Sequence, residues 1–85
     1  MIPFYEKGCI METKYQEQFI RFGLKVQFYR KLRGLTQEAF ADKIGKSWSF
    51  VAKIESPTRA FGVSMETLFR IAEVLQVPVS KLFED

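Results

Sequence analysis

The sequence contains no histidine, and Cys9 is its only cysteine. These absences exclude an internal disulfide bond, the usual Cys/His zinc sites and any mechanism that needs a histidine as acid, base or nucleophile. A reducing compartment suits such a chain, and we expect the cytoplasm. Because no paired-carboxylate motif is present either, we expect no enzyme and no metal, cofactor or small-molecule ligand.

Long apolar runs are also missing. Charged residues interrupt each apolar stretch well before the about 18 residues that suggest a membrane-spanning helix. The first residues, MIPFYEKG, lack the basic leader of a signal peptide. We therefore expect neither a membrane span nor a secretory signal.

Charged residues are unevenly distributed, although the net charge is only +3. Residues 1–35 hold seven Lys and Arg against three acids, whereas residues 60–85 hold two against four. A basic region can attract a phosphate backbone, but a solvated domain without such a partner can show the same imbalance.

The chain of 85 residues is rich in phenylalanine and suits one domain with a single core. Residues 1–16 show no sustained period, and we treat them as an N-terminal arm whose order the sequence leaves open. The domain proper is 17–85. Its first helix is predicted over 17–33, ended by Gly34, because four apolar residues recur there at steps of three and four, namely Phe19, Phe22, Val26 and Tyr29.

Three further helices are predicted to begin after the N-cap residues Thr36, Ser47 and Ser64. Gly45 closes the second helix, and the third runs to about Glu55. Pro78 stops the fourth, whose apolar stripe we assign to the core together with the apolar residues of the two shorter helices. These positions are Phe40, Ala41, Ile44, Val51, Ile54, Met65, Leu68, Phe69, Ile71, Ala72 and Leu75.

A last short helix, VSKLF, is predicted with Leu82 and Phe83 turned inward. No convincing strand is present, so the pattern indicates an all-α bundle of five helices. The second and third helices are joined by a turn of only a few residues at Gly45 and Lys46. They should therefore cross steeply, as in a helix-turn-helix.

The stretch GLTQEAFADKIGKSWSFVAKIE resembles the helix-turn-helix of the phage-repressor and Cro (XRE-like) family of DNA-binding regulators, and the likeness continues through SMETLFRIAEVLQVPVSKLF. The matching positions are Gln37, Ala41 and Gly45, with apolar Phe40, Ile44, Val51 and Ile54. The resemblance implies a five-helix lambda-repressor-like DNA-binding domain. It also implies a transcriptional regulator, repressor-like by family habit, whose partner is double-stranded DNA.

In that family the third helix lies in the major groove and the second crosses the backbone. The resemblance implies base contacts by Trp48, Ser49 and Lys53. It implies phosphate contacts by Gln37, Lys46, Ser47, Ser56, Thr58 and Arg59. Arg30 and Glu55 match a structural ion pair between the first helix and the end of the third. The alternatives are that Gln37, Lys53 and Arg59 are solvated surface residues and that Ser47 is only a helix cap.

Helical geometry places Ser49, Ala52 and Lys53 away from the inward residues of the third helix, with Trp48 and Phe50 on opposite flanks. Phe50 is expected to seal the core against the following loop. Trp48 departs from the family, which more often has a polar residue there. Its indole can meet a thymine methyl or a sugar, fold back onto the second helix as core, or contact a protein.

A rival function follows from this departure, namely a protein-interaction module that keeps the fold and uses Trp48 and Phe50 as anchors. For DNA binding, one recognition helix reads too few base pairs, so a homodimer is expected. Two candidate dimer surfaces are present in the sequence. One comprises Val79, Leu82 and Phe83, which is preferred, and the other comprises Ile2, Phe4, Tyr5 and Ile10.

Overall fold

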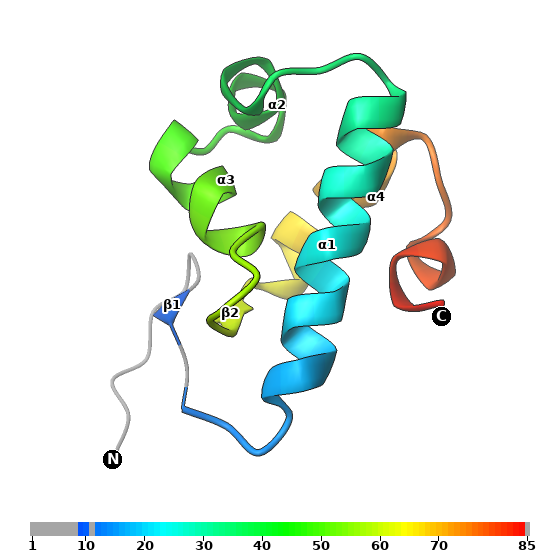
Figure 1. Ribbon diagram of the computed structural model, residues 1–85. Coiled ribbons are helices and arrows are strands. Elements are labelled where there is room, and N and C mark those ends of the chain that lie inside the picture. Colours follow the sequence, from blue (N-terminus) through cyan, green and yellow to red (C-terminus); the bar gives the residue numbers. More distant parts are fainter. Residues whose placement is uncertain (1–8, 11, 85) are drawn as a thin grey trace.

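A computed structural model describes residues 9, 10 and 12–84 of the protein (Figure 1). It is mainly helical, as predicted, and the predicted helices are present with bounds that differ by only a few residues. The elements are β1 Cys9–Ile10, α1 Gln16–Leu32, α2 Gln37–Ile44, α3 Trp48–Ile54, β2 Phe61–Gly62, α4 Met65–Leu75 and the 3-10 helix η1 Val79–Phe83.

The helix boundaries follow from the capping residues. The hydroxyls of Thr36, Ser47 and Ser64 each accept a hydrogen bond from the amide three residues further on, at 3.0–3.1 Å. Each cap therefore satisfies one of the amides that a helix start leaves without an intrahelical acceptor. At the other ends, Gly34 and Gly45 adopt φ values of 73° and 71°, which only glycine reaches without a steric penalty.

A single apolar core lies between the helices. Figure 1 shows α2 almost end-on and α3 from the side, so the two short helices cross steeply, as their tight turn predicted. The 3-10 helix η1 packs against α1 and α4 and closes the core from the remaining side. The core residues with 5% exposure or less include Phe22, Val26, Phe40, Ala41, Ile44, Val51, Ile54, Ile71, Ala72, Leu75 and Leu82.

The stripe on α4 is narrower than predicted. Ile71 and Leu75 are fully buried, but Met65 is 64% exposed and Phe69 is 54% exposed, so their assignment to the core was wrong. Phe69 lies two residues from Ile71, which places it on the opposite side of the helix. The buried arc extends instead to Thr67, which is 5% exposed.

Helix η1 also differs from the prediction. Leu82 is fully buried, whereas Phe83 is 59% exposed. The Phe83 ring contacts the core from outside, stacked on the Phe22 ring with centroids 5.3 Å apart. Successive residues of a 3-10 helix diverge by about 120°, so neighbours cannot both point inward. Leu82 is therefore a core residue and cannot belong to the predicted dimer surface.

The prediction of no strand was wrong at one place. Cys9 pairs with Gly62 and Ile10 with Phe61 in a short antiparallel ladder. This pairing joins part of the predicted N-terminal arm to the loop after α3. The arm residues Ile2, Phe4 and Tyr5 lie outside the described residues.

The end of α4 is set by Gln76 rather than by Pro78. Gln76 has a φ of 60°, in the left-handed region, so the helix ends at Leu75. The guanidinium of Arg33 donates from Nε to the carbonyl of Leu75 at 2.7 Å. A cation at this position offsets the partial negative charge of the helix terminus.

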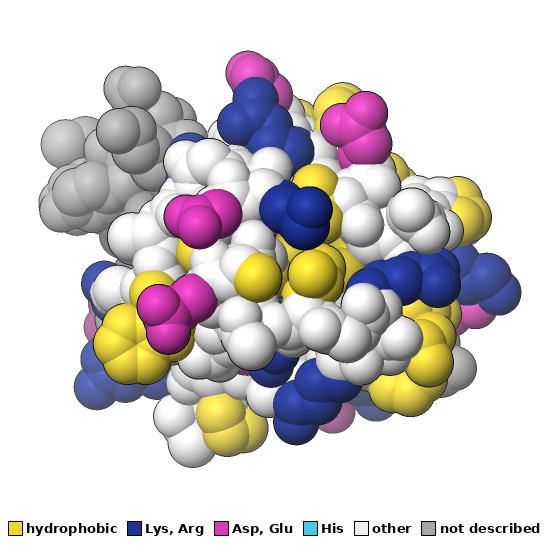
Figure 2. Space-filling model, turned by 90° about the horizontal axis from the view of Figure 1, so that it is seen from above, with side chains coloured by type: hydrophobic (Ala, Val, Ile, Leu, Met, Phe, Trp, Pro, Cys, Tyr) yellow, Lys and Arg dark blue, Asp and Glu magenta, His cyan; other side chains and the backbone are white. Residues whose placement is uncertain are grey.

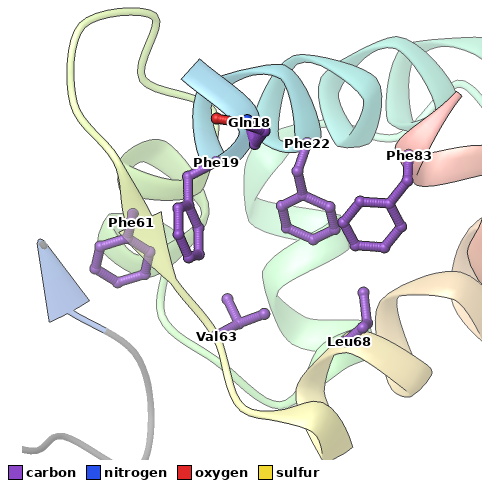
Figure 3. Close-up of a pocket in the computed structure, with 7 residues that line it drawn as sticks. All are labelled: Gln18, Phe19, Phe22, Phe61, Val63, Leu68 and Phe83. Atoms are coloured by element: carbon purple, nitrogen blue, oxygen red, sulfur yellow. The ribbon is translucent and has the colours of Figure 1, made fainter. Parts of the chain in front are cut away.

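An apolar groove of about 230 Å³ lies beside α1, between β2 and Phe83 (Figure 3). Gln18 is its only polar lining residue, and the walls are Phe19, Phe22, Phe61, Val63, Leu68 and Phe83. The groove is smaller than typical ligand pockets and lacks the convergent polar groups that orient a ligand. Within the described part of the chain, no helix has the length and apolar character needed to cross a membrane.

Candidate nucleic-acid interface

Helix α3 presents the strip that the sequence predicted. Val51 and Ile54 are 0% and 2% exposed, whereas Ser49 and Lys53 stand on the solvent side. Trp48, the first residue of the helix, is 59% exposed, so the alternative that it folds back as core is wrong. The outward side of α3 is therefore small and polar, with one aromatic ring at its beginning.

Phe50 takes the place in the core that was predicted for it. It is 9% exposed, and its ring meets the ring of Phe61 edge-on with centroids 5.3 Å apart. The ammonium of Lys46 lies 5.3 Å above the Phe50 ring. A buried ring cannot anchor a partner, so the rival interaction module loses one of its two anchors.

Behind α3, the predicted ion pair between Arg30 and Glu55 is present. The guanidinium donates from Nε to Oε2 at 2.6 Å and from Nη2 to Oε1 at 2.9 Å. The two side chains are only 7% and 2% exposed. Such a two-point contact between buried charges fixes both distance and direction, so it holds α1 against the end of α3.

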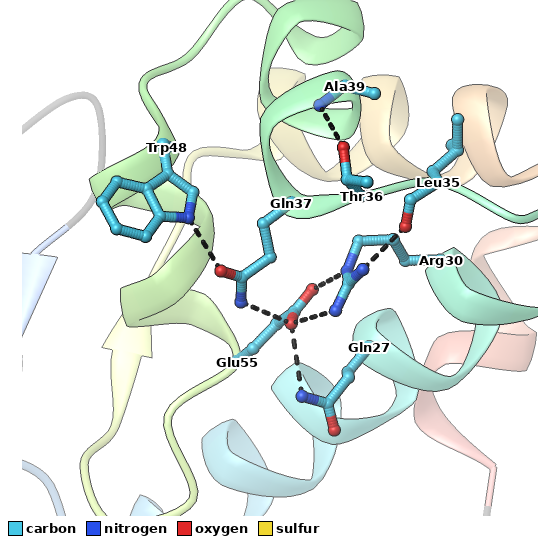
Figure 4. Close-up of polar contacts among 8 residues, drawn as sticks. All are labelled: Gln27, Arg30, Leu35, Thr36, Gln37, Ala39, Trp48 and Glu55. Atoms are coloured by element: carbon cyan, nitrogen blue, oxygen red, sulfur yellow. Dashed lines mark hydrogen bonds and ion pairs between the residues drawn. The ribbon is translucent and has the colours of Figure 1, made fainter.

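The ion pair is the centre of a larger network (Figure 4). Arg30 also donates from Nη1 to the carbonyl of Leu35 at 2.7 Å, and Gln27 donates to Glu55 at 3.3 Å. Among the described residues, no buried side-chain nitrogen or oxygen lacks a hydrogen-bond partner. A fully satisfied network of this kind favours one arrangement of the helices that it joins.

Gln37 connects this network to Trp48. Its amide nitrogen donates to Oε1 of Glu55 at 3.0 Å, and its amide oxygen accepts from Nε1 of Trp48 at 2.8 Å. A phosphate contact by the Gln37 side chain would compete with both bonds. The main-chain amide at the start of α2 needs no such change, because first-turn amides have no intrahelical acceptor.

The other predicted phosphate contacts fall in two places. Lys46 and Ser47 lie in the turn before α3, where the Ser47 hydroxyl already caps the helix. Ser56, Thr58 and Arg59 lie in the loop after α3. There the hydroxyls of Ser56 and Thr58 are 3.3 Å apart, and Arg59 is exposed. The two groups flank the outward strip of α3, and their phosphate contacts stay predictions.

Charge on this part of the molecule is mixed. Figure 2 looks down on the end where α2 lies and shows basic and acidic side chains side by side. Residues 36–59, which span α2 and α3, hold four Lys and Arg against three acids. The long-range field is therefore modest, and short-range contacts must carry most of any discrimination between partners.

The sequence prediction missed Gly23, in the middle of α1. A Cβ atom there would lie 1.8 Å from the carbonyl oxygen of Ile54. Only glycine lets α1 approach the last turn of α3 this closely, and the Arg30 contact depends on that approach. The sequence did carry a signal of this contact. A glycine inside a helix costs about 1 kcal/mol relative to alanine, so its presence there suggests a packing reason.

Comparison with protein families gives one match over most of the domain. The model of a family described as helix-turn-helix matches residues 26–82. A protein of Sinorhizobium medicae (strain WSM419), named as an HTH-type transcriptional regulator, is 33% identical over 66 residues. A protein of Rhizobium meliloti (strain 1021), also named as an HTH-type transcriptional regulator, is likewise 33% identical over 66 residues. The match covers 78% of this chain but 46% of each relative, so the chain spans about half their length.

Solved structures agree with the fold. The restriction-modification controller protein C.AhdI from Aeromonas hydrophila is similar with a TM-score of 0.70 and 28% identity, over 79% of this chain and 98% of that one. SinR, the master regulator for biofilm formation, solved in complex with DNA, is similar with a TM-score of 0.67 and 28% identity. That match covers 74% of this chain and 98% of the SinR chain in that structure. The SinR DNA-binding domain has also been solved from Bacillus subtilis.

Proposed function

The chain belongs to the helix-turn-helix family, and from this premise we propose that it binds double-stranded DNA and regulates transcription by occupying a specific site. The observation that supports this most directly is the outward strip of α3, where Ser49 and Lys53 are exposed and Trp48 is 59% exposed. In a helix-turn-helix this strip is the part that enters the major groove.

The chemistry of the strip suits base edges. A groove about 12 Å wide admits a helix whose outward side chains are small and polar. Ser49 can donate to or accept from a base, and the ammonium of Lys53 donates to the O6 and N7 acceptors of guanine. In this proposal Trp48, Ser49 and Lys53 make the base contacts.

Phosphate contacts position the domain on the duplex. We assign them to the main-chain amide of Gln37 at the start of α2 and to the groups on either side of α3. Those groups are Lys46, Ser47, Ser56, Thr58 and Arg59. Such contacts carry little sequence information, but they supply most of the salt-dependent affinity.

The working unit in this proposal is a homodimer on half-sites about 34 Å apart, because one recognition helix reads too few base pairs. Of the preferred dimer surface, Phe83 remains exposed and Val79 is half-buried. The proposed mode of action is repression by occupancy in the cytoplasm, without catalysis or a cofactor.

A salt titration tests DNA binding before any operator is known. The protein is titrated with mixed-sequence duplex DNA at two salt concentrations, and we expect weak association that decreases as salt rises. Absence of binding at low salt would favour the rival function, a protein-interaction module in which Trp48 is the one remaining anchor. Selection from a random duplex library then identifies the preferred site.

The role of Lys53 is tested on the selected site. Lys53→Ala should relax the preference at one base pair, with a discrimination loss of about 1–3 kcal/mol. Lys43→Ala is the matched control, because Lys43 lies on α2 beside a groove lined by Arg33 and Glu73 rather than on the α3 strip. Equal losses for the two variants on all sequences would contradict the role given to Lys53.

A further inference from the structure

Trp48 is placed for base contact but has no hydrogen bond left to offer. Its ring is 59% exposed at the first position of α3. An indole has one donor, Nε1–H, and no acceptor. That donor is already bound to the amide oxygen of Gln37 at 2.8 Å (Figure 4).

The Gln37 amide cannot turn over to release this donor. Its nitrogen faces Oε1 of Glu55 at 3.0 Å, and Glu55 is held by Arg30 in the buried ion pair. A turned amide would place its oxygen against the carboxylate and its nitrogen against the Trp48 N–H. Both contacts would then be repulsive, acceptor against acceptor and donor against donor. The charge of Glu55 therefore determines, through Gln37, what Trp48 presents to solvent.

The surface that Trp48 presents is consequently apolar. In the major groove every base edge offers donors or acceptors, and the C5 methyl of thymine is the one apolar group that projects into the groove beyond a C–H. We propose that Trp48 reads the 5-methyl group of a pyrimidine, normally thymine, and that Gln37 is its positioning residue. This inference rests on the proposed function, and it names the chemical feature that the first residue of α3 selects.

The test replaces each thymine of the selected site with deoxyuridine, one at a time, which removes the methyl group and nothing else. We expect one position in each half-site to lose about four-fold in affinity, the value of one buried methyl-sized group. Replacing that base pair with 5-methylcytosine opposite guanine should bind better than unmethylated cytosine does. Insensitivity at every thymine would overturn the proposal.

Two variants at Trp48 separate its ring from its N–H. Trp48→Phe keeps an apolar ring but loses the bond to Gln37, so it should keep a reduced uracil effect, as Gln37→Met should. Trp48→Ala should abolish that effect, so that thymine and uracil sites bind alike. Lys43→Ala, which lies off the α3 strip, is the control and should leave the uracil effect intact. Persistence of the effect in Trp48→Ala would overturn the proposal, and so would its complete loss in Trp48→Phe.

The positioning role of Gln37 has its own readout, because Trp48 is the only tryptophan and its fluorescence reports on this ring alone. Gln37→Met keeps the length of the side chain but removes both hydrogen bonds. It should shift the emission, increase quenching by acrylamide and reduce the uracil effect, whereas Lys43→Ala should change neither fluorescence property. Unchanged fluorescence in Gln37→Met would contradict the role given to Gln37.

Failure of this inference is distinguishable from failure of the proposed function. A protein that binds no duplex at low salt fails before any uracil comparison, and then DNA binding itself is wrong. A protein that binds its selected site equally well with thymine and uracil is still a DNA-binding regulator. In that case only the apolar reading by Trp48 is wrong.

Discussion

The two sides of α1 are both apolar, yet only one of them is covered. On the inner side Phe22 and Val26 are 5% and 0% exposed. On the outer side Leu24, Phe28 and Leu32 are 40%, 56% and 61% exposed. Hydrophobicity alone therefore does not decide which side of this helix faces the core.

The inner side differs in two residues that are not large apolar ones. Gly23 lets the backbone of α1 approach Ile54, and Arg30 binds Glu55 at 2.6 Å. Burial of large apolar side chains supplies most of the favourable free energy, but such side chains can pack against many different surfaces. The glycine and the ion pair specify that this side packs against α3, and thereby set the position of the outward strip of α3.

The largest predicted effect on stability comes from removing the carboxylate of Glu55, which pairs with Arg30 on the inner side of α1. Glu55→Ala leaves the guanidinium of Arg30 buried without its partner and should lower the free energy of unfolding by about 3–5 kcal/mol. Chemical denaturation measures it. Glu66→Ala is the control, because that carboxylate is 84% exposed and pairs with Arg70 at 3.5 Å on the surface. Its loss should be about 1 kcal/mol or less.

Gly23→Ala tests the close approach itself. The new Cβ would have to move away from the carbonyl of Ile54, and overpacking of this kind costs about 1–3 kcal/mol. Alanine favours a helix over glycine by about 1 kcal/mol, so a net loss of stability would show that the contact outweighs propensity. Leu24→Ala on the outer side is the comparison and should cost less. A stabilised Gly23→Ala protein would show that α1 does not need this approach.

Residue patterns predicted the helices of this fold well, since their caps and stops are local. Thr36, Ser47 and Ser64 cap the helices they were assigned to, and Gly45 ends α2. The pairing of Arg30 with Glu55 came from the family resemblance, because their separation in sequence carries no local signal. What periodicity could not supply is the width of the arc that neighbouring elements cover.

That missing width explains the errors at Met65 and Phe69, because their part of the α4 stripe meets no neighbouring element that would bury it. The error at Phe83 has another cause, since Phe83 follows the buried Leu82 in a 3-10 helix and its ring only stacks on Phe22. The contact between Gln37 and Trp48 was missed for a different reason. Both side chains were assigned to DNA, and only three-dimensional geometry shows that one satisfies the other.

A double replacement separates stability from orientation on the inner side. Arg30→Met with Glu55→Met removes both buried charges together, and such exchanges are often close to neutral for stability. We therefore expect the free energy of unfolding to lie within about 1 kcal/mol of that of the parent protein. This change is much smaller than the loss expected for Glu55→Ala. Gln37 would lose its anion, so acrylamide quenching of Trp48 should rise as it does in Gln37→Met. A double variant as unstable as Glu55→Ala would mean that the pair itself stabilises the fold.

The smallest predicted effect is on the outer side of α1. Phe28 is 56% exposed and its ring contacts Tyr29 edge-on at 5.0 Å, so Phe28→Gln removes little buried area. Surface substitutions of this kind usually change stability by at most about 0.5 kcal/mol, and DNA affinity should not change because α3 is untouched. Denaturation and DNA titration check these two expectations, and sedimentation of the same variant measures its oligomeric state. A loss of oligomeric state in Phe28→Gln would show that the outer side is covered after all, by a second copy, and the contrast between the two sides of α1 would then hold only for the monomer.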